Sequence, residues 1–202
     1  MMVLLGISGA SGAAYGVRTL SLLLARGADT HVLVTKTAWG ILASEVWNGK
    51  LPGGMNARRK GLGRLSSSSR SFRLYPEDDF GIPFASGSNA PDAMIISPCS
   101  MGTLGRIAHG VSSSVLTRCA DVALKERKPL VLVTRETPLS VIHLENMLTL
   151  ARAGAHVLPA CPGFYHRPET VSGLVDFVVS RALSCIGIDA GVLPKWGEGK
   201  EE

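Results

Sequence analysis

The sequence predicts a doubly wound α/β fold, with a mostly parallel β-sheet covered by helices on both faces in three layers. Short apolar runs alternate along the chain with longer segments whose apolar residues recur at the spacing of an amphipathic helix. The run 92–97 is apolar almost throughout, as expected for a strand covered on both faces. The chain has 202 residues, 46% of them hydrophobic, which is enough for one core, and a single domain over 1–202 is expected.

The apolar runs and the turn residues between them place the individual elements. The expected strands are 2–7, 31–34, 92–97, 129–133 and 156–159. The first expected helix ends near Arg26, a second is capped by 35–37 and runs to about Val46, and the others are 103–109, 113–125, 140–153 and 170–183. The apolar face of helix 140–153 is expected to consist of Leu144, Met147, Leu148 and Ala151.

A glycine-rich loop joins the first strand to the first helix. Gly6, Gly9 and Gly12 allow a ligand to approach the backbone, and the following helix start offers unpaired N–H groups. The spacing differs from the G-x-G-x-x-G pattern of dinucleotide folds, and no acidic residue ends the second strand to hold a ribose. Taken alone, the loop is explained equally well as a tight turn with Ser11 as the helix N-cap.

The positive charge of the chain is local. The formal net charge is +5, yet seven basic residues and no acidic ones lie between Lys50 and Arg73, so the remainder carries −2. The segment is also rich in glycine and serine, which predicts a mobile surface insertion at about 53–73. Phe72 is its only aromatic residue, so nothing indicates base stacking, and nucleic acid is not expected as a partner.

Several classes of protein are not indicated by the sequence. No apolar run reaches the roughly 18 residues that a membrane span needs, and residues 2–7 read as a strand rather than a signal peptide, so a cytoplasmic location is expected. The four cysteines form no C-x-x-C pair and the five histidines are scattered. We therefore expect reduced, mostly buried thiols and no metal site.

Polar residues follow the expected strands at the points where ligands bind in open α/β sheets, beyond the carboxyl ends of the strands. They are Gly9 to Ser11, Thr35, Ser100 to Thr103, Arg135 with Glu136, and the loop that carries Tyr165. Each has a structural alternative. Ser100 and Thr103 are suited to capping a helix, Arg135 and Glu136 to a surface ion pair, and Tyr165 to anchoring its loop. Their placement at one edge of the sheet favours a binding site.

Seven motifs also carry a family resemblance. They are GASGA (9–13), ASGS (85–88), PCSMGT (98–103), ADVALKE (120–126), RE (135–136), IHLENM (142–147) and PGFY (162–165). Together they resemble the flavin prenyltransferases, the UbiX family, from about Val3 to Trp196 and outside the basic insertion. The resemblance implies a Rossmann-like flavoprotein fold.

The resemblance further implies an enzyme that transfers a dimethylallyl group from dimethylallyl monophosphate to N5 and C6 of reduced FMN. The prenylated FMN would serve a UbiD-type decarboxylase. The family works without a metal and forms homo-oligomers, typically dodecamers, with sites at subunit junctions.

The resemblance also assigns roles to residues. The expected FMN-binding residues are Gly9, Ala10, Ser11, Thr35, Ser100, Met101, Gly102, Thr103 and Arg135. Those expected to hold the prenyl phosphate or line its pocket are Lys125, Arg135, Tyr165, Arg181, Phe80 and Trp196, and those of the catalytic region are Ser11, Glu45, Arg118 and Glu136. Phe80 stands where the family is expected to have a tryptophan.

The chemistry suits these residue types. Breaking a C–O bond to phosphate without a metal calls for fixed cations on the leaving group, such as Lys125, Arg135 and Arg181. Aromatic faces stabilise an allylic cation. Proton removal from the flavin carbon needs a base, either Glu136 or the released phosphate. As structural alternatives, Arg181 suits a helix surface and Trp196 could pin the C-terminal tail.

Two other functions remain open at this point. An FMN-dependent cysteine decarboxylase of the same fold would be expected to carry a Pro-Ala-Met-Asn motif, whereas this chain has TRETP at 134–138 after its fourth expected strand. A non-catalytic partner that delivers flavin to a decarboxylase would bind FMN without converting it.

Overall fold

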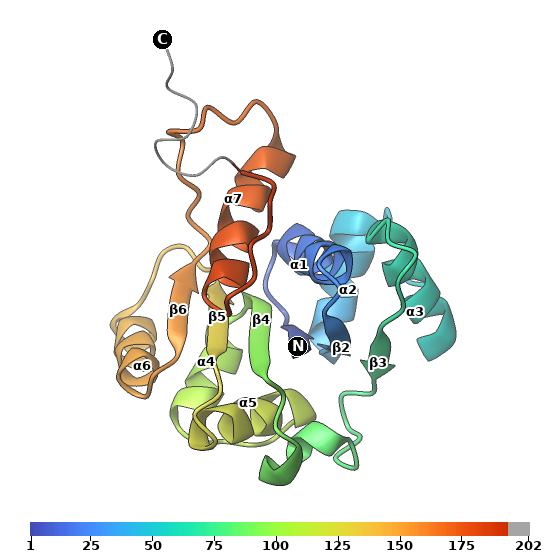
Figure 1. Ribbon diagram of the computed structural model, residues 1–202. Coiled ribbons are helices and arrows are strands. Elements are labelled where there is room, and N and C mark those ends of the chain that lie inside the picture. The colour runs from blue at the N-terminus through green and yellow to red at the C-terminus, as the bar shows by residue number, and fades with distance from the viewer. Residues whose placement is uncertain (194–202) are drawn as a thin grey trace.

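The computed structural model describes residues 1–193 and contains one parallel sheet between two layers of helices (Figure 1). The strand order is β3-β2-β1-β4-β5-β6, and each neighbouring pair is parallel. The strands are β1 Met2–Ile7, β2 Asp29–Val34, β3 Arg73–Tyr75, β4 Ala93–Cys99, β5 Leu130–Thr134 and β6 His156–Pro159. The order reverses at β1, which is the topology expected of a doubly wound sheet.

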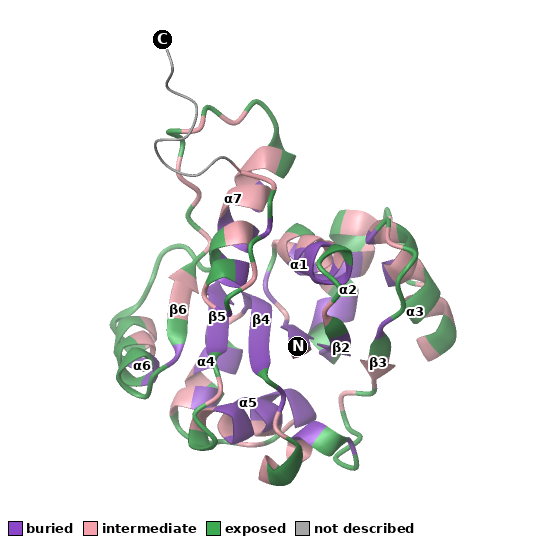
Figure 2. Ribbon diagram, viewed as in Figure 1, coloured by how far each residue is buried: buried purple, intermediate pink, exposed green. Residues whose placement is uncertain are grey.

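The helices divide between the two faces of the sheet. They are α1 Ala13–Ala25, α2 Lys36–Val46, α3 Gly54–Leu65, α4 Met101–Ala108, α5 Val115–Lys125, α6 Val141–Arg152 and α7 Val171–Ser184, with short 3-10 turns η1 Pro83–Ala85 and η2 Gly87–Asn89. Val3 and Leu5 of β1 pack with α1, α2, α3 and α7 in one core, whereas Leu4 packs with α4, α5 and α6 in the other. The central strands are buried from end to end (Figure 2). The predicted three-layer fold is confirmed.

The strand β3 was not predicted from the sequence. It has three residues and, within residues 1–193, pairs with β2 alone, where Arg73 lies opposite His31. Its residues are exposed or half-buried, so they lack the apolar run by which the other strands were found.

None of the helices within residues 1–193 combines the length and the apolar character that spanning a bilayer requires.

The prediction of a surface loop at 53–73 is wrong for much of this segment, because residues 54–65 form α3. Leu62 of α3 is fully buried in the core that contains α1 and α2. The guanidinium of Arg58 lies 5.0 Å from the ring centroid of Trp39 in α2. Met55, Leu62 and Leu65 recur at intervals of seven and three, which places them on one helix face. The abundant glycine and serine obscured this sparse pattern.

The orientation of α6 also differs from the prediction. Asn146 and Leu150 are its buried residues, whereas Leu144 and Leu148 are each 50% exposed. The helix packs on α4, where a Cβ at Gly105 would lie 3.2 Å from Nδ2 of Asn146. Because α6 lies beside the edge strand β6 (Figure 1), only a narrow stripe of the helix is covered, and Leu144 and Leu148 face outward.

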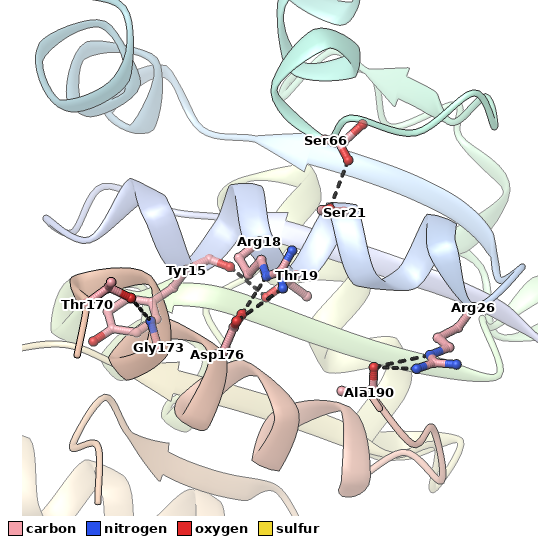
Figure 3. A network of polar contacts seen from close by, with 10 residues as sticks. All are labelled: Tyr15, Arg18, Thr19, Ser21, Arg26, Ser66, Thr170, Gly173, Asp176 and Ala190. Atoms are coloured by element: carbon pink, nitrogen blue, oxygen red, sulfur yellow. Dashed lines mark hydrogen bonds and ion pairs between the residues drawn. The ribbon is translucent and has the colours of Figure 1, made fainter. Parts of the chain in front are cut away.

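Helix α1 is the element to which distant segments attach (Figure 3). Arg18 donates two hydrogen bonds to the carboxylate of Asp176 in α7, at 2.5 and 3.1 Å. Arg26 donates to the carbonyl of Ala190 at 2.6 and 3.2 Å. The hydroxyl of Ser21 donates to the carbonyl of Ser66, which follows α3, at 2.8 Å. The segment after α7 and the basic segment are therefore both tied to the first helix.

Leu62→Ala in α3 will lower the free energy of unfolding by about 3 kcal/mol, because it leaves a cavity in the core. Arg59→Ala, on the exposed side of the same helix, will change it by less than about 0.5 kcal/mol. Urea titrations followed by circular dichroism measure both. Equal and negligible effects of the two changes would show that the segment behaves as a loop.

Candidate active site

The loop after β1 is held by a carboxylate from α2. The backbone N–H groups of Gly12 and Ala13 donate to the carboxylate of Glu45 at 3.0 and 2.8 Å. Gly12, not Ser11, is the N-cap of α1, and no side chain of the loop caps the helix. The alternative in which Ser11 is the cap is therefore not what the structure shows. Glu45 supplies the negative charge that a helix N-terminus favours.

The surroundings of Glu45 keep it ionised. Burial by itself would raise the pKa of the carboxyl group, but a hydrogen bond with Ser11, the two backbone N–H donors and the charge of Arg135 together hold the pKa below its ordinary value. A positive charge and three donors thus converge on one anion at the start of α1.

Arg135 connects two strand ends. It follows β5, and its Nε donates to the carbonyl of Ser11 at 3.0 Å. Arg135 and Glu136 line a cavity of about 110 Å³ together with Met101 at the start of α4 and Cys161 beyond β6. No ion pair joins Arg135 to Glu136 within residues 1–193. The expectation that these side chains lie over the carboxyl edge of the sheet agrees with this cavity.

A second cavity, of about 260 Å³, lies where three helices begin. Thr35, Ser100 and Ser114 are the N-caps of α2, α4 and α5, and all three line it. The remaining lining residues are Lys36, Thr37, Glu77, Thr103, Arg106 and Ser113. Helix N-termini, hydroxyl groups and two cationic side chains make this a cavity suited to an anion.

The hydroxyl groups in this cavity are partly committed to capping. Thr35 accepts a hydrogen bond from the N–H of Ala38 at 3.2 Å, and Ser100 accepts one from that of Thr103 at 3.3 Å. Arg106 donates to the hydroxyl of Thr103 at 3.3 Å. Ser100 therefore caps a helix, as its structural alternative predicted, and it also lines the cavity.

Ser8 positions the second loop, and sequence reasoning missed it. Its hydroxyl donates to the carbonyl of Pro98 at 3.0 Å and accepts from the N–H of Ser100 at 2.8 Å. The residue thereby fixes the β4–α4 turn relative to β1. Its place directly after a buried strand was the available signal. Arg106, three residues after Thr103 on one helix, was likewise detectable, whereas Glu77 and Ser114 lie outside any motif considered.

A third cavity, of about 470 Å³, contains Tyr165 and Arg181. The ring of Tyr165 meets that of Phe177 in α7 edge to face, with centroids 5.6 Å apart. Arg181 lies further along α7 and is exposed. The structure therefore brings together two of the residues expected to hold the prenyl phosphate, on the side of the sheet covered by α7.

Other expected site residues lie apart from these cavities. Lys125 ends α5 and pairs with Glu126, beside Gly87 and at the amino edge of the sheet, opposite the strand ends. Arg118 donates to the carbonyl of Ala85 at 3.0 Å and to Asp121 at 2.7 Å. Phe80 is half-exposed in the loop before η1, and Trp196 lies outside the described residues.

Comparisons with known proteins identify the family. Residues 1–183 match the Flavoprotein family model. A flavin prenyltransferase UbiX of Pseudomonas aeruginosa is 48% identical over 197 residues, covering 97% of this chain and 94% of that protein. One from Methanocaldococcus jannaschii is 39% identical and covers 98% and 99%. The chain belongs to the flavin prenyltransferase family.

Solved structures of UbiX and UbiX-like proteins have the same architecture. AnUbiX (PadA1), crystallised with FMN and dimethylallyl pyrophosphate, is 35% identical with a TM-score of 0.85, covering 96% of each chain. A dodecameric FMN-dependent UbiX-like decarboxylase from Escherichia coli O157:H7 is 38% identical with a TM-score of 0.81, covering 94% and 96%. The cysteine decarboxylase TvaF, at 16% identity and a TM-score of 0.58, shares only the fold.

Replacing Glu45 will test its role at the start of α1. Glu45→Gln will destabilise the protein by about 1 kcal/mol at pH 7, because the helix N-terminus loses its negative charge. A carboxyl whose pKa is lowered by folding contributes fully above its unfolded pKa of about 4.3, and the contribution disappears as pH falls through the lower folded value. The stability difference from wild type will therefore shrink below about pH 4.

Thermal unfolding from pH 3 to pH 7 measures this difference. Glu145→Gln, an exposed carboxylate on α6, is the matched control and will show no such pH dependence. A stability loss at Glu45 that is the same at every pH would mean that shape rather than charge is responsible.

Proposed function

We propose that the protein transfers a dimethylallyl group from dimethylallyl monophosphate to reduced FMN without a metal. The C–O bond to phosphate breaks as N5 of the flavin bonds to the allylic carbon and loses its proton. The prenyl double bond then takes up a proton, its tertiary carbon bonds to C6, and the C6 proton leaves, so that phosphate and one net proton are released. Reduced FMN supplies the electron-rich N5 and C6. The proposal is supported by membership of the family and rests on one observation, the clustering of anion-binding groups from four strand ends at the carboxyl edge of the sheet.

The residues present fit FMN. The 260 Å³ cavity offers the hydroxyl groups of Thr35, Ser100 and Thr103 together with the guanidinium of Arg106, which suits the 5′-phosphate. A Cβ at Gly9 would lie 2.3 Å from Oγ1 of Thr37, so the first flavin loop touches the start of α2 beside this cavity. Gly9, Ala10 and Ser11 then face the flavin from one side and Met101 and Gly102 from the other.

Arg135 and Glu136 are proposed to act at the reacting end. Arg135, already fixed through Ser11, presents its remaining N–H groups to flavin and to the leaving phosphate. Glu136, in the adjacent 110 Å³ cavity, is proposed to accept the proton from the flavin carbon. Arg181 and Tyr165 line a different cavity from Arg135, so they are proposed to hold the prenyl phosphate where two copies of the chain meet, and Glu45 is proposed to keep Ser11 in position.

We propose that the site is completed by a second copy of the chain in a homo-oligomer, as large as a dodecamer. Within one chain Lys125 ends α5 at the amino edge of the sheet, and neither Lys125 nor Arg118 lines the cavity of Arg135, so a neighbouring copy is proposed as the source of Lys125 at the prenyl phosphate. The outward face of α6 supports assembly, since Val141 and Ile142 are 69% and 67% exposed and Leu144 and Leu148 are half-exposed. A related protein is dodecameric.

The product is proposed to serve a UbiD-type decarboxylase in the cytoplasm. The cysteine-decarboxylase alternative is not favoured, because the proteins of that type share only the fold with this chain. A protein that only delivers flavin would bind FMN without converting it, so measuring turnover distinguishes this role from catalysis.

The proposed reaction is tested by incubating the protein with excess reduced FMN and dimethylallyl monophosphate without air. Mass spectrometry of the flavin will show the gain of one prenyl group on many equivalents of FMN for each protein chain. Binding of FMN without any mass gain would support delivery, and no binding of FMN would overturn the proposal.

The same assay, together with measurements of FMN affinity, distinguishes the role of Glu136 from that of Arg135. Glu136→Gln keeps the shape but removes the base, so turnover will fall by roughly 10²–10⁴-fold while FMN affinity changes little. Arg135→Lys keeps the charge but loses the planar fork, so the affinities for both ligands will fall. Normal turnover by Glu136→Gln would make the released phosphate the better candidate for the base.

Assembly is tested on α6. Ile142→Asp will shift the protein to smaller species in analytical ultracentrifugation, because it places a charge in an apolar contact, and turnover will fall with it. Leu51→Asp, an exposed apolar residue away from α6, is the control and will leave the size unchanged. A variant at Ile142 that remains fully assembled would exclude this face as the interface.

A further inference from the structure

Glu77 is an acidic residue in a cavity that is otherwise built for an anion. It lies in the loop between β3 and η1 and lines the 260 Å³ cavity. Its carboxylate accepts a hydrogen bond from the backbone N–H of Lys36 in the first turn of α2. Its backbone carbonyl accepts one from the N–H of Val115, the first residue of α5, at 3.2 Å. Glu77 is therefore held from two helix starts at once.

The charges around Glu77 explain why its carboxylate lies there. The N-termini of α2, α4 and α5 converge on this cavity, and Lys36 and Arg106 add positive charge. Each of these groups attracts an anion, and among the described residues that line the cavity Glu77 alone is acidic. Its carboxylate engages a backbone donor that a phosphate bound at the start of α2 would also need.

We propose that Glu77 sets the affinity of this cavity for the flavin phosphate, by competing with it for the N–H of Lys36 and by repelling its charge. The inference rests on the proposed function, in which the 5′-phosphate of FMN binds here. Prenylation changes N5 and C6 and leaves that phosphate untouched, so every contact to it holds substrate and product alike. Binding of this uniform kind does not accelerate the chemical step and delays release of the product.

A carboxylate that weakens the phosphate site therefore shortens the time the product stays bound. The helix starts and hydroxyl groups of the cavity orient the phosphate, and Glu77 lowers the affinity with which they bind it. The residue is a positioning and affinity-setting group for the phosphate, and it touches none of the reacting atoms.

The test compares Glu77→Gln with wild type by calorimetry, using FMN, riboflavin and inorganic phosphate as separate ligands. Glutamine keeps an acceptor for the N–H of Lys36 and removes only the charge. FMN and inorganic phosphate will bind at least about tenfold more tightly to the variant, and riboflavin, which lacks the phosphate, will bind as before. Asp78→Asn removes the same charge from the exposed neighbouring residue and is the matched control, with no change for any ligand.

Kinetics supply the second measurement. In Glu77→Gln a single turnover will proceed at the wild-type rate, whereas the steady-state rate will fall because product leaves more slowly. Glu77→Asp keeps the charge on a shorter side chain and will bind FMN within a fewfold of wild type, which controls for damage to the loop.

Three results would overturn the inference. Unchanged or weaker FMN binding by Glu77→Gln would show that the negative charge of Glu77 does not weaken phosphate binding. If Glu77→Gln also raised the affinity for riboflavin by the same factor, the substitution would be acting on the flavin ring through the loop. If the wild-type protein bound riboflavin as tightly as FMN, the phosphate of FMN would not be bound in this cavity. Prenylation of FMN, detected by mass spectrometry, would in that case still support the proposed reaction.

Discussion

The close approach of α1 to β4 is the constraint on which the site depends. A Cβ at Gly16 would lie 2.6 Å from the carbonyl oxygen of Ser97, so only glycine lets the helix sit this near the strand. The hydroxyl groups of Thr19 and Ser97 meet at 3.2 Å one turn further along. This packing brings the loop after β1 close to the end of β4, where Ser8 can bridge to Ser100 and Arg135 can reach the carbonyl of Ser11.

The helix starts at these strand ends differ in whether a carboxylate lies against them. The start of α1 is neutralised by Glu45, and that of α2 is shared with Glu77. The starts of α4 and α5 are capped by the hydroxyl groups of their own serines, which leave the helix dipoles without a counter-charge. The helix starts that lack a counter-charge therefore lie at the 260 Å³ cavity and not at the glycine-rich loop.

The sequence was most informative where one local pattern determines one local structure. The apolar runs located five strands, and Thr35, Ser100, Ser140 and Thr170 were found at helix starts because a hydroxyl before an apolar helix has a specific capping role. Sequence reasoning failed where the deciding contact is remote. Nothing near Glu45 shows that it reaches Gly12, which is 33 residues away in sequence. The outward leucines of α6 obey helical periodicity as well as buried ones do, so periodicity could not orient the helix.

The carboxylate of Glu45 has a consequence for any attempt to redesign the chain for another ligand. Converting the loop 9–12 to the dinucleotide fingerprint and adding an acidic residue after β2 would supply the pattern that a pyrophosphate normally needs. The start of α1 would still be occupied by an ionised side chain from a neighbouring helix. A pyrophosphate placed there would meet a negative charge at contact distance, so a residue of α2, outside the loop that carries the glycines, would oppose dinucleotide binding at that loop.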